Sequence, residues 1–124
     1  MSQCFYASVK ELFQHAAGDR RSLPGMIASL QCYGDDPTRF HPHLHSLVTD
    51  GLVSPEGSFV PVSYPDPVRI MELFRHKLVK ALLAREKIAP RLVEIMQNWV
   101  HPGFSVGPAR ASAAAPRRAS DPIR

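Results

Sequence analysis

The sequence predicts an α+β protein, in which helices flank a small antiparallel sheet. Apolar residues recur at helical spacing over residues 3–17 and 67–87. Between these segments lie three apolar or alternating runs, at 26–33, 41–49 and 57–62, each bounded by Gly, Pro or Asp residues typical of turns. These five segments predict two main helices and three strands of one domain, with further elements over residues 90–106.

The first predicted helix begins after Ser2, which is a suitable N-cap, and ends at Gly18. Pro24-Gly25 indicates a turn before the run 26–33, which has the apolar composition of a buried strand. Apolar residues mark the core face of the helix: Phe5, Val9, Leu12, Phe13 and Ala16.

The second and third strands are expected to form a hairpin. The run 41–49 ends at Asp50-Gly51, a turn dipeptide, and the stretch "DGLVSPEG" has the composition of a hairpin connection. Pro61 lacks a backbone N–H and places the strand 57–62 at a sheet edge.

Two helices are expected after the sheet. Asp66 and Pro67 form an N-cap and first-position pair for a helix over 67–87, and a further helix over 90–100 opens at Pro90. The stretch 101–106 reads as a turn and a strand. The apolar positions of these helices predict core contacts for Ile70, Phe74, Leu78, Ala81, Leu82, Leu92, Ile95, Met96 and Trp99.

Composition indicates one domain, residues 1–106, followed by a low-complexity tail, residues 107–124, that we expect to be disordered. The net charge of the whole chain is +4, but the tail carries four arginines and one aspartate. The domain has 11 basic and 10 acidic residues, so its net charge does not indicate nucleic-acid binding. The sequence shows neither a long apolar segment nor a signal peptide, and its two cysteines lack metal-site spacing, so we expect a cytoplasmic protein with no membrane partner.

Three of the six histidines lie at positions 41, 43 and 45, within "FHPHLHSLVTDG". In a strand their side chains project from one face, and next-but-one residues lie about 6.5–7 Å apart. That spacing allows two imidazoles to bind one divalent ion. The alternative is that these histidines are ordinary surface or core residues.

A longer stretch, "GMIASLQCYGDDPTRFHPHLHSLVTDGLVSPEGSFVPV", and the later "NWVHPGFSV" resemble the rolling-circle, two-tyrosine insertion-sequence transposases. His43-Leu44-His45 matches the His–hydrophobic–His (HUH) signature of that family, and the resemblance covers residues 20–106. It implies an HUH endonuclease-like core, which is incomplete here. It also implies single-stranded DNA at insertion-sequence ends as the partner, and Mg²⁺ or Mn²⁺ as the cofactor. In the implied reaction a tyrosine attacks the phosphodiester and forms a 5′-phosphotyrosine.

The resemblance implies that His43 and His45 are metal ligands and that Gln31 is the third. His41 is a possible additional ligand, whereas Asp50 and His101 are weaker candidates. No residue is assigned a catalytic role, because the family's nucleophilic tyrosines follow "GFSV" and this chain has none there. Its tyrosines are Tyr6, Tyr33 and Tyr64, and of these Tyr33 is expected to be a packing residue.

The family's N-terminal cysteine-rich zinc module is also absent from the sequence. We therefore expect a transposase fragment, from a truncated or frameshifted reading frame, that is inactive alone and associated with the bacterial nucleoid. Two alternatives remain open. One is a non-catalytic DNA-binding remnant. The other is an unrelated metal-dependent hydrolase that uses the histidine cluster and a water nucleophile.

A basic stripe on the second main helix is a candidate phosphate-binding surface. Its members fall on one side of the helix, opposite the core face: Arg69, His76, Lys80 and Lys87. A solvated helix face is the favoured reading, since Glu72 and Glu86 lie near the stripe.

Overall fold

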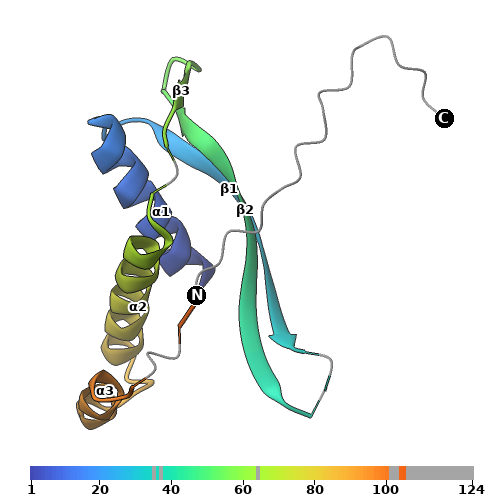
Figure 1. Ribbon diagram of the computed structural model, residues 1–124, viewed down its shortest axis with the longest axis vertical. Coiled ribbons are helices and arrows are strands. Elements are labelled where there is room, and N and C mark those ends of the chain that lie inside the picture. Colours follow the sequence, from blue (N-terminus) through green and yellow to red (C-terminus); the bar gives the residue numbers. More distant parts are fainter. Residues whose placement is uncertain (35, 37, 64, 101–103, 106–124) are drawn as a thin grey trace, which may run out of the picture.

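A computed structural model describes residues 1–34, 36, 38–63, 65–100 and 104–105. The elements in chain order are α1 (Ser2–Ala17), β1 (Leu23–Tyr33), β2 (Phe40–Val53), β3 (Phe59–Pro61), α2 (Pro67–Ala84) and α3 (Pro90–Gln97) (Figure 1). This arrangement confirms the α+β class. The expected tail, 107–124, and most of the expected segment 101–106 lie outside the described residues.

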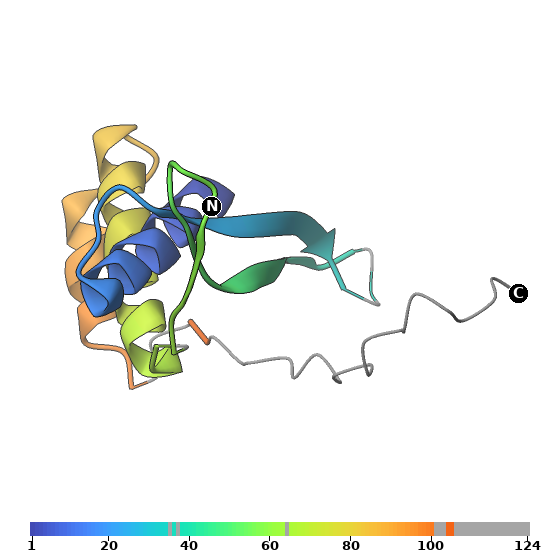
Figure 2. The same cartoon turned by 90° about the horizontal axis from the view of Figure 1, so that it is seen from above.

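The three strands form one antiparallel sheet in the order β1-β2-β3. β1 and β2 pair over most of their length, whereas β3 pairs only with residues 51–53 of β2. Pro61 therefore lies in an edge strand, as predicted. The β1–β2 hairpin is long, and its closed end extends away from the helices (Figures 1 and 2).

The core lies where α1 and α2 meet the base of this hairpin. Its buried apolar residues come from all three elements: Phe5, Val9, Phe13, Leu52, Ile70 and Phe74. The rings of Phe5 and Phe74 make an edge-to-face contact with centroids 5.6 Å apart. Lys77 of α2 also donates to Glu11 of α1 over 2.7 Å, which ties the two helices together.

The helix ends follow the predictions in part. Gly18 takes a left-handed conformation (φ 66°) at the end of α1, and the Asp66 carboxylate accepts from the backbone N–H of Val68 at 3.0 Å. Ser2 is not the N-cap of α1. The helix begins one residue earlier, because the carbonyl of Met1 already accepts from the N–H of Phe5 at 3.1 Å.

Two turn predictions were wrong. Pro24 and Gly25 lie within β1, where the N–H of Gly25 donates to Oγ1 of Thr49 at 2.9 Å. Asp50 and Gly51 lie within β2, and the turn follows at "SPEG", where Gly57 has φ 87°. Turn-forming residue types therefore mark irregular strand positions here rather than chain reversals.

Gly51 has a packing role in β2. A Cβ at this position would lie 2.2 Å from the carbonyl oxygen of Val60 and 2.9 Å from the Cα of Pro61. Both atoms belong to the β3 backbone, which passes directly beside Gly51. Glycine is thus required by the close approach of the edge strand.

Residues 26–33 lie in a strand, as predicted, but the prediction that this strand is buried was wrong. Ile27 is 75% exposed and Leu30 is also exposed, since the hairpin extends beyond the helices that would cover it. Trp99, Leu92 and Ile95 were also expected to be buried, but all three are exposed. α3 meets α2 where Arg75 donates to the carbonyl of Met96 at 3.2 Å, and among the residues that the structure describes it contributes no buried side chain.

Candidate functional site

The sheet has a covered face and an open face. Met26, Leu44 and Val48 pack against the core, as does the fully buried Leu52. Side chains alternate between the two faces of a strand, so these even-numbered residues define the face toward the helices. The histidines at 43 and 45 and the glutamine at 31 therefore project from the opposite, open face.

The strand register brings Gln31, His43 and His45 together. Gln31 is the direct partner of His43, and Ser29 is the partner of His45. The amide Oε1 of Gln31 lies 3.2 Å from Nε2 of His45, so the side chain reaches diagonally to the second histidine. The imidazole rings of His43 and His45 have centroids 5.9 Å apart.

The other ligand candidates are placed differently. The ring of His41 contacts that of His43, with centroids 4.6 Å apart. Asp50 lies near the opposite end of β2, and His101 is outside the described residues. Within the described ranges, no three His, Cys, Asp or Glu side chains are arranged so that they could hold a metal ion. The trio of Gln31, His43 and His45 differs from such a group, because one of its three side chains is an amide.

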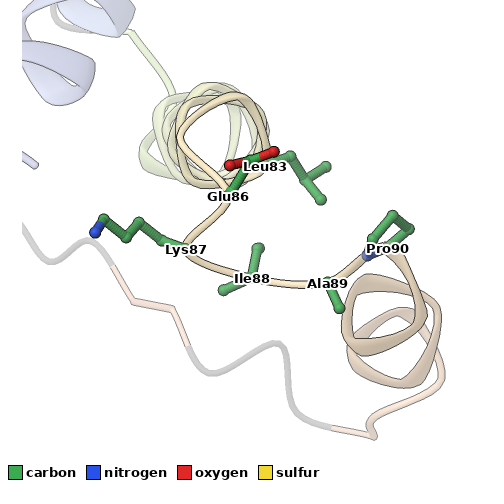
Figure 3. A pocket seen from close by; sticks show the side chains of 6 residues that line it. All are labelled: Leu83, Glu86, Lys87, Ile88, Ala89 and Pro90. Atoms are coloured by element: carbon green, nitrogen blue, oxygen red, sulfur yellow. The ribbon is translucent and has the colours of Figure 1, made fainter.

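Two depressions of the described part of the chain lie elsewhere. A shallow one of about 540 Å³ follows the link between α2 and α3 and is lined by Leu83, Glu86, Lys87, Ile88, Ala89 and Pro90 (Figure 3). A second, of about 510 Å³, lies between the two helices, where Arg75 donates to the carbonyl of Met96 at 3.2 Å. The Gln31–histidine cluster thus lies on an open strand surface rather than in either depression.

The basic stripe is present only in part. Arg69, His76 and Lys80 are exposed on α2. Lys87 does not continue the stripe, because α2 ends at Ala84 and Glu86 adopts φ 54°. Figure 3 shows the side chain of Lys87 extending away from Ala89 and Pro90.

A further feature of the hairpin was missed by the sequence reasoning. Tyr33 and Phe40 are register partners at its closed end, and their rings meet edge to face with centroids 6.1 Å apart. The signal in the sequence was an aromatic residue on each side of the turn "GDDPTR". Tyr33 does pack, as expected, but its partner is another exposed side chain rather than the core.

Comparison with known families gives one match. Residues 25–101, more than half of the chain, match the family model described as "Putative transposase" (Y2_Tnp). The matched region contains nearly all of β1 and the whole of β2, and hence Gln31, His43 and His45. No curated protein and no solved structure matches the chain.

The chain is therefore a member of a transposase family. That family is the Y2 transposase family of rolling-circle insertion sequences, and the resemblance described from the sequence is confirmed. Membership of a transposase family implies a DNA partner. In the part of the chain that the structure describes, none of the helices has the length and apolar character needed to cross a membrane.

Proposed function

We propose that this chain binds single-stranded DNA at insertion-sequence ends and holds a divalent ion, Mg²⁺ or Mn²⁺, through His43, His45 and Gln31. It supplies the metal-binding part of metal-assisted nicking and joining in DNA transposition, a reaction that the chain does not complete alone, and we propose the bacterial nucleoid as its location. The observation that carries this proposal is the 3.2 Å approach of the Gln31 amide oxygen to Nε2 of His45.

The two atoms lie within hydrogen-bond distance of each other, and the same separation is compatible with two ligands of one ion. Two atoms bound at about 2.1 Å to a single metal lie about 3.0–3.4 Å apart, for angles between square and tetrahedral. The amide oxygen is a ligand that Mg²⁺ and Mn²⁺ accept, and neutral imidazole supplies nitrogen donors. The donor set thus supports a divalent site on the open face of the sheet.

The open face also suits a DNA substrate, because a strand lying across the sheet can reach the histidines without entering a pocket. A bound divalent ion there would polarise a phosphodiester and offset its developing charge. The role of the protein is to hold that ion through His43 and His45, with Gln31 fixed beside them by the strand pairing. We further propose that Arg69, Lys80 and Lys87 contact phosphates, with Lys87 reaching them from beyond the helix.

No residue of this chain is assigned as the nucleophile of the reaction. The hydroxyl of Tyr6 donates to the carbonyl of Pro24 at 3.2 Å, and Tyr33 packs against Phe40. We propose that the chain alone binds metal and DNA without forming a covalent intermediate. The second candidate, a DNA-binding remnant that does not bind metal, is separated from this one by metal titration.

Calorimetric titration with Mn²⁺ tests the metal site. We expect binding to the wild-type chain and loss of binding in His43→Ala and His45→Ala. The matched control is His15→Ala, which removes an exposed histidine from α1 and should leave the titration unchanged. Equal Mn²⁺ affinity in wild type and His43→Ala would exclude the proposed site.

Incubation with Mn²⁺ and a labelled oligonucleotide tests whether the chain binds DNA without forming a covalent intermediate. We expect a complex on a native gel and no labelled band that survives denaturation. A covalent protein–DNA adduct, located by peptide mapping to one of the tyrosines, would show that the chain carries its own nucleophile.

A further inference from the structure

The closed end of the β1–β2 hairpin presents two aromatic rings to solvent. Phe40 is 70% exposed and Tyr33 is 51% exposed, although they contact each other edge to face. The hairpin carries them away from α1, α2 and α3 (Figures 1 and 2). The two rings in contact form a contiguous apolar surface at the projecting end, and such surfaces are typical of interaction sites.

This aromatic pair is continuous with the candidate metal site. Phe40 directly precedes His41, and Tyr33 follows Gln31 by two residues. In the strand register, the pair Tyr33–Phe40 is the next recorded pair beyond Gln31–His43, after a local irregularity. Between these two pairs β2 has one residue more than β1, so the even–odd alternation that sets the face of His43 does not extend to Phe40. A DNA strand that runs from His43 toward the closed end of the hairpin would reach the aromatic pair.

We propose that Tyr33 and Phe40 form a stacking platform for an unpaired base of the DNA strand held at the Gln31–His43–His45 site. The inference rests on the proposed function and adds a base-binding position to it. Bases of single-stranded nucleic acid stack on exposed aromatic side chains, and the interaction tolerates any base because every base has a π face.

The charges near the pair favour stacking over phosphate binding. Nε of Arg39 lies 3.6 Å from a carboxylate oxygen of Asp36, and the same carboxylate accepts from the backbone and hydroxyl of Thr38. Among the described residues of this segment, the carboxylate of Asp36 thus offsets the charge of Arg39. The contribution of the platform should therefore depend weakly on salt and on base identity.

Fluorescence anisotropy with a labelled single-stranded oligonucleotide, full-length chain and Mn²⁺ tests the platform. Phe40→Ala should weaken binding about 5- to 100-fold, the range that stacking of one base contributes. Phe40→Trp keeps an aromatic ring at this position and should bind with about the wild-type affinity. The matched control is Phe59→Ala, which removes a 54% exposed aromatic from β3 at the other end of the sheet and should leave affinity unchanged.

Two further measurements distinguish stacking from charge. The slope of log affinity against log salt should be the same for wild type and Phe40→Ala, since no phosphate contact is lost. An oligonucleotide whose bases are replaced by abasic sites should bind both proteins equally. A changed slope, or a persistent difference on abasic DNA, would overturn stacking as the mechanism.

The outcomes separate this inference from the proposed function. Wild-type affinity in Phe40→Ala, with metal-dependent DNA binding intact, overturns the platform and leaves the proposed function standing. Absence of single-stranded DNA binding in the wild type overturns the proposed function itself. The aromatic pair could instead bind a second copy of the chain, and sedimentation velocity tests this. A wild-type dimer that dissociates in Phe40→Ala, with unchanged DNA affinity, would assign the pair to a contact between two copies and would overturn the platform.

Discussion

The amide oxygen of Gln31 lies 3.2 Å from Nε2 of His45, although the register partner of Gln31 is His43. Cross-strand partners lie closest in a sheet, and diagonal neighbours are within reach of long side chains. Gln31 is thus positioned beside one histidine by the backbone and in contact with the other through its side chain. One residue of β1 thereby links both histidines of β2.

This relationship predicts the response of metal binding to substitution at position 31. Gln31→Leu should lower Mn²⁺ affinity by about 10- to 100-fold or more. Loss of a residue that only supports a metal ligand already lowers affinity by that range. Gln31→Glu keeps an oxygen in place and adds negative charge, so affinity should be retained or increased. Calorimetry measures both, with Ser29→Ala on the same face as the control. Undiminished affinity in Gln31→Leu would remove Gln31 from the ligand set.

The close approach of β3 predicts that Gly51→Ala is destabilising. The added methyl group would meet the backbone at Val60 and Pro61, and overpacking of this kind costs about 1–3 kcal/mol of the free energy of unfolding. Urea denaturation followed by circular dichroism measures it. Gly34→Ala serves as the control, because a Cβ there meets no atom within 4 Å. Equal unfolding midpoints for the two variants would contradict the packing at Gly51.

The burial pattern predicts opposite effects for two aromatic substitutions. Phe74 is buried between the rings of Phe5 and Phe104, with centroids 5.6 and 5.9 Å away, so Phe74→Ala should cost about 3–5 kcal/mol. Trp99 is 51% exposed, and Trp99→Ala should cost about 1 kcal/mol or less. Thermal unfolding compares the two. A large loss of stability in Trp99→Ala would show that Trp99 contributes to the core, as the sequence predicted.

Asp19 predicts a pH dependence of stability. A hydrogen bond from the buried Ser22 hydroxyl, and a second from the N–H of Arg21 at 2.8 Å, lower the pKa of Asp19 below its ordinary value of 3.8. A depressed folded-state pKa stabilises the protein above the ordinary value, and that contribution is lost as the pH falls through the folded-state pKa.

Asp19→Asn should therefore be less stable than wild type near neutral pH, and the difference should shrink below about pH 3.8. Urea titrations at several pH values measure this difference. Asp50→Asn, at an exposed position on β2, is the control. A stability difference for Asp19→Asn that persists unchanged in acid would show that the carboxylate charge has no part in it.

The exposed cations of α2 predict a salt effect on DNA binding. If Lys80 contacts a phosphate, Lys80→Gln should reduce the slope of log affinity against log salt by about 0.7, the value for one contact with single-stranded DNA. Lys77→Gln is the control, since Lys77 is engaged with Glu11. An unchanged slope in Lys80→Gln would identify the stripe as an ordinary solvated face.

Local sequence signals predicted the elements whose stabilising contacts are local. Asp66 caps α2 through a bond to a residue two positions away, and Gly18 ends α1 by its own left-handed conformation. The alternation of histidines placed 43 and 45 on one face, because alternation is a property of any strand. Turn signals misled at Pro24 and Asp50, where pairing with a distant strand overrides local preference.

The sequence by itself determined the α+β class, the histidine strand and the transposase family. Hydrophobic periodicity, residue spacing and motif order can all be read from the sequence without knowledge of tertiary contacts. Tertiary structure alone decided which face is open, that Gln31 reaches His45, and that Tyr33 meets Phe40 at the hairpin end. Each of these depends on the register of β1 against β2. That register is fixed by packing at the base of the hairpin, where Leu52 is fully buried, and composition does not reveal it.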